Sequence, residues 1–228
     1  MKRLAVIQSN YVPWKGYFDL IGLVDEFVVY DDVSYTKNDW RNRNRIKTAA
    51  GAEWLTIPVE RASIGRPIDE ARVTDARWRE QHWRTLEQNY RRAPYFELYA
   101  TELRALYETD ERLLTRVNRS FIASICTWLG IGTTITDVRD YEPEGEPTER
   151  LVRLCELAGA TEYLTGPSAR AYLREDMFAR AGIMLTYMDY TGYPEYPQLY
   201  GDFVHEVTVL DLILNTGPEA PRYMKWAS

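Results

Sequence analysis

Short apolar runs alternate with amphipathic segments near both ends of the chain. Four-residue apolar runs predict strands over residues 4–7 and 27–30, and residues 17–24 between them are compatible with a helix. The alternation returns later, with strands predicted over 133–138, 162–165 and 183–188 and helices over 148–157, 169–181 and 207–215. Such alternation is typical of α/β proteins. We therefore predict a Rossmann-like three-layer α/β fold with a parallel or mixed sheet.

The middle of the chain has helical spacing instead. Apolar residues recur at intervals of three to five and predict helices over 76–91, 95–107 and 110–129. Upstream, a strand is predicted over 53–59 and a short strand near 68–73 within a loop. Because strand-like segments lie on both sides of the helices, we predict one domain over residues 1–228 with a helical insertion at about 76–130.

Composition narrows the class of protein. The formal net charge of −6 argues against general nucleic-acid binding, which needs a positive face. No apolar run approaches the length of a membrane span, and the start lacks a long apolar region, so we expect a cytoplasmic protein without a membrane span. Cys126 and Cys155 lie in apolar helical segments and favour buried thiols. With two cysteines and two histidines, we predict no metal site.

The segment between Ile7 and Lys47 contains more polar and aromatic residues than a hydrophobic core needs. They follow the carboxyl ends of the first two predicted strands, where open α/β sheets bind ligands. We therefore predict a binding site there, with these members: Gln8, Asn10, Tyr11, Trp14, Lys15, Tyr17, Asp31, Asp32, Tyr35, Trp40, Arg41, Arg43 and Arg45.

The arginines in this cluster alternate with asparagines. In an extended segment Arg41, Arg43 and Arg45 would share one face, and guanidinium groups match phosphate oxygens. The hypothesis is a phosphate or pyrophosphate ligand. Ion pairs with Asp31, Asp32 or other acids explain the same residues equally well.

Three side chains are candidates for acid or base chemistry. Asp31 and Asp32 follow a strand, where adjacent side chains point to opposite faces, so at most one of them should face a ligand. That carboxylate could act as a base, bind a cation or accept hydrogen bonds from sugar hydroxyls. The structural alternative is that the aspartates cap a turn. His82 is our first candidate for a general base near neutral pH, ahead of His205, although a lone histidine beside an apolar stripe is more often a packing residue.

Two later segments are candidate parts of the site. Ser168 follows a predicted strand and precedes a helix, which suits an anion site or a simple helix cap. Tyr193, Tyr196 and Gln198 lie in a segment rich in aromatic residues and proline, which suits a sugar or nucleoside pocket or a rigid loop packed on the core.

The first turn is similar to that of adenylyl-transfer enzymes, in which paired histidines stabilise the transferring phosphates. Here residues 13–17 occupy that place without histidines, and only Lys15 could supply the charge. The turn can equally be an aromatic contact that packs the first helix on the sheet.

The ordered motifs resemble the WbqC-like protein family. The likeness is carried by residues 8–19, Asp31-Asp32-Val33, residues 40–47, His82, Asn89-Tyr90, Pro94-Tyr95-Phe96, Thr165-Gly166-Pro167-Ser168, Tyr196-Pro197-Gln198 and Asp211 before Asn215. The resemblance spans nearly the whole chain. It implies a setting in O-antigen or other surface-polysaccharide gene clusters, with a nucleotide-linked or lipid-linked sugar, often an amino sugar, as substrate.

These inferences lead to a hypothesis about function. We expect an enzyme that transfers an acyl or aminoacyl group to the amine of a nucleotide-linked sugar, with Arg43 and its neighbours on the diphosphate, Tyr11 and Trp14 stacking, and His82 or Asp31 as base. An ATP-dependent amide ligase and a non-catalytic binding or assembly protein are the alternatives. The acyl donor or ATP would be the co-substrate, and the sequence leaves the donor, the sugar and the oligomeric state open.

Overall fold

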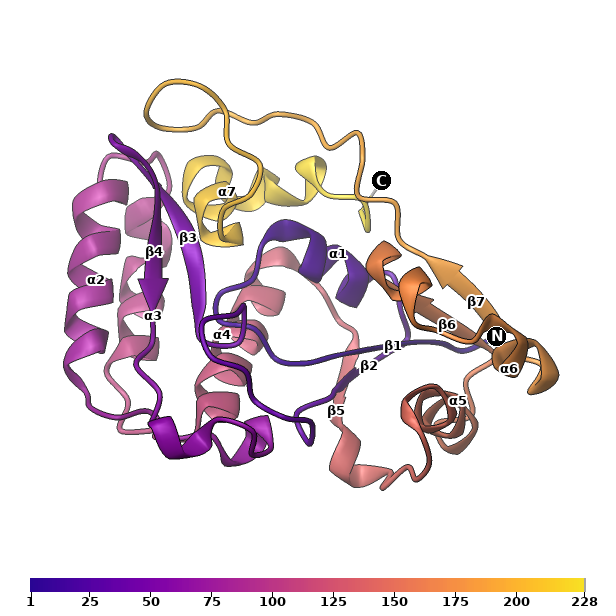
Figure 1. Cartoon of the computed structure of the whole chain (residues 1–228). Helices are drawn as coiled ribbons and strands as arrows, with labels where there is room; N and C mark the ends of the chain where they lie inside the picture. Colours follow the sequence, from indigo (N-terminus) through magenta and orange to yellow (C-terminus); the bar gives the residue numbers. More distant parts are fainter. Residues whose placement is uncertain (228) are drawn as a thin grey trace.

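A five-stranded parallel sheet runs through the middle of the molecule (Figure 1). The structure is a computed structural model that describes residues 1–227, so Ser228 of the predicted domain lies outside the described residues. The strands are β1 (Arg3–Ile7), β2 (Glu26–Val29), β5 (Thr134–Asp137), β6 (Glu162–Thr165) and β7 (Met184–Tyr187), in the spatial order β5-β2-β1-β6-β7. Every neighbouring pair is parallel, which confirms the predicted α/β class.

Helices cover both faces of this sheet because successive strand residues point in opposite directions. Ala5 and Phe27 belong to one core, and Leu4 and Val28 to the other. The first core packs against α1 (Lys15–Gly22), α4 (Leu114–Leu129) and α7 (Val209–Thr216), and the second against α5 (Pro147–Leu157) and α6 (Glu175–Arg180). The three-layer prediction is therefore confirmed.

The segment between β2 and β5 holds more than the predicted helices. It begins with an antiparallel hairpin of β3 (Arg43–Thr48) and β4 (Gly51–Thr56), which forms a separate two-stranded sheet. The helices α2 (Arg77–Tyr90), α3 (Phe96–Tyr107) and α4 follow, as predicted. The assignment of the whole chain to one domain stays a prediction.

Two local predictions are wrong. Residues 68–73 form no strand, because the Ile68 and Asp69 amides donate to carbonyls of residues 33 and 31 and leave only a 3-10 turn, Ile68–Glu70, with isolated bridges beside it. Residues 169–181 are not one helix: a 3-10 turn, Pro167–Ala171, precedes α6, because Leu173 turns into the second core between them.

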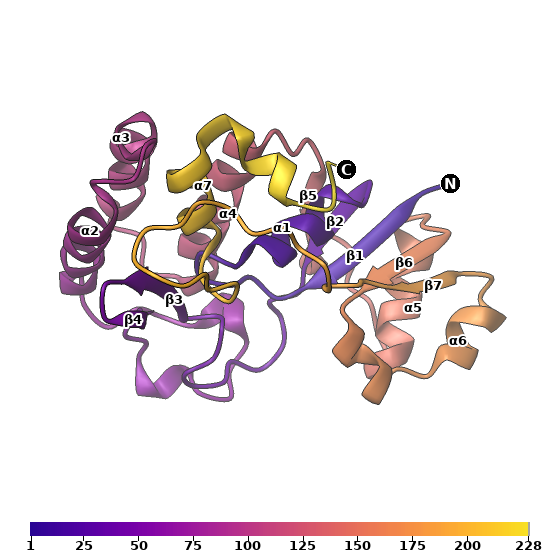
Figure 2. The ribbon, with the colours of Figure 1, turned by 90° about the horizontal axis from the view of Figure 1, so that it is seen from above.

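Residues 188–208, which we call the strap, contain no helix or strand, and they return from β7 toward the hairpin and then to α7 (Figures 1 and 2). Asp211 on α7 fixes the strap, since its carboxylate accepts hydrogen bonds from Tyr196 Oη at 2.8 Å and Gln198 Nε2 at 2.7 Å. Lys47 on β3 donates to Gln198 Oε1 at 2.9 Å. The strap is thereby joined to both β3 and α7. None of the helices within residues 1–227 has the length and apolar character needed to cross a membrane.

Candidate functional site

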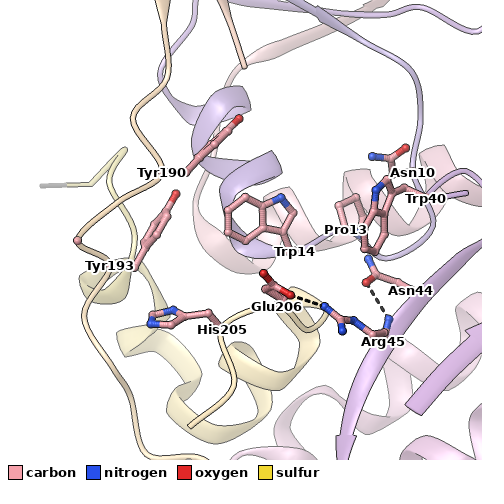
Figure 3. A pocket seen from close by; sticks show the side chains of 11 residues that line it. Asn10, Pro13, Trp14, Trp40, Asn44, Arg45, Tyr190, Tyr193, His205 and Glu206 are labelled. Carbon is pink, nitrogen blue, oxygen red and sulfur yellow. Dashed lines mark hydrogen bonds and ion pairs between the residues drawn. The ribbon is translucent and has the colours of Figure 1, made fainter. Parts of the chain in front are cut away.

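A cavity of about 650 Å³ opens at the carboxyl edge of the sheet, beside the strap (Figure 3). Within the sheet, β2 and β5 lie on one side of β1, and β6 and β7 lie on its other side. The order of the strands along the chain therefore reverses direction at β1. Open α/β sheets bind ligands at such a point. The lining residues are Asn10, Pro13, Trp14, Trp40, Asn44, Arg45, Tyr190, Gly192, Tyr193, His205 and Glu206.

Aromatic rings form one wall of the cavity. The Trp14 ring centroid lies 5.2 Å from that of Tyr190 and 5.9 Å from that of Tyr193. The indole of Trp14 also lies over the first turn of α1, where a Cβ atom on Gly16 would come within 2.4 Å of it. Gly16 is therefore the residue that lets Trp14 occupy the wall.

The opposite wall comes from β3. Arg45 Nη2 lies 2.6 Å from Glu206 Oε2 on the strap. Asn44 Nδ2 donates to the Val12 carbonyl at 2.9 Å and holds the loop after β1. Val12 has a φ of 36°, which is strained for a β-branched residue. This clamp fixes the loop that carries Asn10 and the tryptophan wall.

Two polar atoms at this site lack partners. The Oδ1 atom of Asn10 and the Nε atom of Arg45 are shielded from solvent and have no hydrogen-bond partner among the described residues. Buried polar groups are normally paired, because an unmade hydrogen bond is costly. One acceptor and one donor in residues that line the cavity are therefore left without a protein partner in the described chain.

His205 is the histidine at the cavity. Its side chain is exposed, and the small desolvation that it undergoes, followed by the positive charge of Lys15, lowers the pKa of its imidazole. The ring packs edge-on against Phe203, with centroids 4.5 Å apart. Because the imidazole is neutral at pH 7, its unprotonated nitrogen can accept a proton.

Lys15 lies behind the cavity wall. Its Nζ atom is 4.6 Å from the ring centroid of Tyr193 and 5.1 Å from that of Tyr196. Burial lowers the pKa of Lys15 to about 8, against the opposing charges of Asp19 and Asp211. The predicted binding residue is thus adjacent to the cavity without lining it.

The structure brings five of the predicted site residues to the cavity: Asn10, Trp14, Trp40, Arg45 and Tyr193. Arg43 shares the outer face of β3 with Arg45. Arg41 precedes the strand, and its Nη1 atom lies 3.6 Å from Asp39 Oδ2. Tyr196 and Gln198 lie in the network that fixes the strap. Ser168 is exposed in a 3-10 turn and lies outside the cavity lining.

His82 lies in a buried aromatic cluster. Its Nδ1 atom is 2.9 Å from the Tyr11 hydroxyl, which is 2.7 Å from the Tyr107 hydroxyl. Burial lowers the pKa of His82 to about 4. Its observed contacts position Tyr11, and through Tyr11 the loop after β1.

The two aspartates have separate partners away from the cavity lining. Asp31 is buried and accepts from the Ser9 amide at 2.8 Å, from the Ser9 hydroxyl at 2.6 Å and from Thr115. Asp32 pairs with Arg150. Nearby, Tyr17 donates to the Gln8 carbonyl at 3.1 Å, and Tyr35 is buried. These contacts hold the carboxyl ends of β1 and β2 together.

Sequence reasoning did not select Asn44, Tyr190, Gly192 or Glu206. The sequence did contain a pattern that could have identified Asn44. Asn44 alternates with Arg43 and Arg45, which places its side chain on the opposite face of an extended segment. Tyr190 lies in the aromatic and proline-rich segment that suited a sugar or nucleoside pocket, but its contact with the loop after β1, like the contact of Glu206 with β3, depends on the tertiary fold. Within the described chain, no group of three or more His, Cys, Asp or Glu side chains is arranged to hold a metal ion.

Comparisons with known proteins cover almost the entire chain. The model of the WbqC-like protein family matches residues 8–223. An uncharacterized protein of Mycobacterium tuberculosis, Rv1507c, is 47% identical over 228 residues, which are 99% of this chain and 99% of that protein. No solved structure matches the chain. Both sequence matches therefore concern the whole fold rather than one motif.

Proposed function

We propose that this chain, which belongs to the WbqC-like protein family, is an enzyme of surface-polysaccharide or related amino-sugar biosynthesis that transfers an acyl or aminoacyl group to the amine of a nucleotide-linked sugar. The observation that carries the proposal is the cavity at the strand-order reversal, with aromatic rings on one wall and Arg45 on the other. Its volume of about 650 Å³ falls within the range of small-molecule sites.

The walls suggest how the ligand lies. The apolar face of a sugar ring packs well on aromatic rings, so the sugar is placed beside Trp14 and Tyr193. The amide side chain of Asn10, a lining residue, hydrogen-bonds a sugar hydroxyl or amine. The guanidinium of Arg45 binds a phosphate oxygen.

His205 replaces His82 as the proposed base, because His205 lines the cavity and its lowered pKa leaves it neutral. The sugar amine attacks the carbonyl carbon of the acyl donor, and a C–N bond forms. The bond from that carbon to the donor's leaving group breaks, and its electron pair leaves with that group. The nitrogen loses one proton, which His205 accepts and can pass to the leaving group.

The position of Lys15 gives the ligase alternative less support than the transferase. Lys15, the one cation near the first turn, is surrounded by aromatic rings and donates to the Pro194 carbonyl at 3.5 Å. It is absent from the cavity lining. The ligase hypothesis assigns Lys15 and the arginines to the phosphates, and of these Arg45 lines the cavity whereas Lys15 does not.

Product formation tests the proposal. We expect the protein, mixed with a UDP-linked amino sugar and a panel of acyl thioesters and aminoacyl donors, to give an N-acylated sugar nucleotide detectable by mass spectrometry. His205→Gln should lower turnover by roughly a hundredfold or more, whereas His82→Phe, which removes a contact that positions Tyr11, should lower it far less. Product that forms only with ATP would support the ligase, and binding without product under any donor would support the non-catalytic alternative.

A further inference from the structure

Two exposed tryptophans lie side by side next to the cavity. Trp40 is 45% exposed and Trp54 is 44% exposed, and their ring centroids are 5.6 Å apart. Trp40 also lines the cavity, whereas Trp54 lies outside it on β4. The pair therefore extends the aromatic surface of the cavity onto the outer face of the hairpin.

Arginines cover this pair from the neighbouring strand. The register of the hairpin sets Arg45 directly opposite Trp54, so their side chains share one face. The guanidinium carbon of Arg43 lies 4.2 Å from the Trp54 ring centroid, and that of Arg45 lies 5.6 Å from it. The surface thus combines aromatic rings with two positive charges.

Arg43 has no acidic partner for its charge among residues 1–227, and the contact of its guanidinium is with the Trp54 ring. It forms no ion pair with any residue in the part of the chain that the structure describes, and its buried Nε atom has no hydrogen-bond partner there. The chain carries 34 acidic residues against 28 lysines and arginines, so an unpaired arginine beside two exposed indoles points to an external anion.

We propose that Trp40, Trp54 and Arg43 form a nucleoside-diphosphate platform that continues from the cavity onto the outer face of the hairpin. The base stacks on Trp54, the diphosphate lies between Arg43 and Arg45, and the attached sugar enters the cavity past Trp40. This inference rests on the proposed function and adds the position of the nucleotide. Because every base has an aromatic face, stacking without hydrogen bonds to the base edge tolerates different bases. UDP and dTDP are therefore expected to bind with similar affinity.

Calorimetric titration with four probes tests the platform: uridine, UDP, a UDP-linked amino sugar and the free amino sugar. Trp54→Ala should weaken binding of the three uridine-containing probes roughly tenfold and leave the free sugar unchanged. Arg43→Ala should weaken UDP roughly tenfold and leave uridine unchanged, because uridine lacks phosphates. Trp54→Phe should restore most of the affinity.

Trp128→Ala is the matched control. This half-buried indole donates to Glu102 and packs on Tyr99, on α4 away from the hairpin, so its loss should leave UDP binding intact. Circular dichroism checks that each variant is folded, and Trp54→Phe keeps the test valid should Trp54→Ala misfold.

The outcomes separate the two proposals. Equal UDP affinity in the wild type and Trp54→Ala would overturn the platform and leave a sugar nucleotide in the cavity. No binding of UDP or the sugar nucleotide to the wild type would overturn both. A wild type that is dimeric, with a monomeric Trp54→Ala and unchanged UDP binding, would also overturn the platform, since the indoles would then serve an interface between copies.

Discussion

Arg45 Nη2 and Glu206 Oε2 lie 2.6 Å apart at the cavity (Figure 3). The pair joins β3 to the strap, and both residues line the cavity. It also neutralises the one cation among the lining residues, so an anionic ligand must compete with Glu206 for Arg45. This competition has a measurable consequence.

Removing the charge of Glu206 should strengthen anion binding. In Glu206→Gln, Arg45 is free of its carboxylate partner, and we expect the affinity for UDP to rise several-fold. The side chain of Glu206 is 77% exposed, so the melting temperature should change little. Glu219→Gln, which removes a carboxylate from an exposed pair with Arg222, is the control and should leave affinity unchanged. Unchanged or weaker UDP binding in Glu206→Gln would contradict the assignment of Arg45 to a phosphate.

A methyl group on Gly16 should displace the cavity wall. Its Cβ would lie 2.4 Å from the Trp14 ring, so the indole must move. We expect Gly16→Ala to weaken sugar-nucleotide binding roughly tenfold, because the stacking surface is lost. Gly132→Ala is a matched control, since a Cβ there meets nothing within 4 Å. Equal affinities in the two variants, measured by calorimetry, would exclude Trp14 from the binding site.

His82 should influence the pH dependence of stability. Its folded-state pKa of about 4 lies below the value of about 6.5 expected in the unfolded chain, so the unfolded chain binds the proton first. The stabilising contribution is present above pH 6.5 and is lost between pH 6.5 and 4, by roughly 3 kcal/mol. Urea unfolding of the wild type and His82→Phe should show their difference in stability shrinking or reversing over that interval. A constant difference would show that His82 is not buried in neutral form.

His205 should control the acid side of the activity profile. Its pKa is lowered by a small desolvation and by the charge of Lys15, so kcat/KM should fall at a lower pH than an unperturbed histidine would give. Lys15→Met keeps an apolar side chain among the rings but removes the charge, and the fall should then move to higher pH. In His205→Gln the fall of kcat/KM at acid pH should disappear. An unmoved profile in both variants would eliminate His205 as the base.

The sheet was predictable because its signal is local. Apolar runs such as residues 4–7 and 27–30 bury alternate side chains in two cores, and a parallel sheet with helices on both faces is the arrangement that satisfies them. The predicted helix over 169–181 failed because its periodicity did not reveal that Leu173 turns inward.

The candidate site was only half predictable. Asn10, Trp14 and Arg45 stood out as residues that a core does not need. His82 was selected as one of two imidazoles able to act as a base near neutral pH, with packing as the alternative, and its hydrogen bond to Tyr11 lies in a buried aromatic cluster. The strap residues Tyr190 and Glu206 lie more than a hundred residues after Trp14 and Arg45 in the sequence. They reach the cavity through tertiary contacts, which leave no local pattern in a single sequence.

A crystal structure of the protein with a UDP-linked amino sugar tests the central claim most directly. We expect the sugar between Trp14 and His205, and the diphosphate within hydrogen-bond distance of Arg45. An empty cavity at saturating ligand, or a sugar nucleotide bound elsewhere on the molecule, would contradict the claim that this cavity is the sugar-nucleotide site.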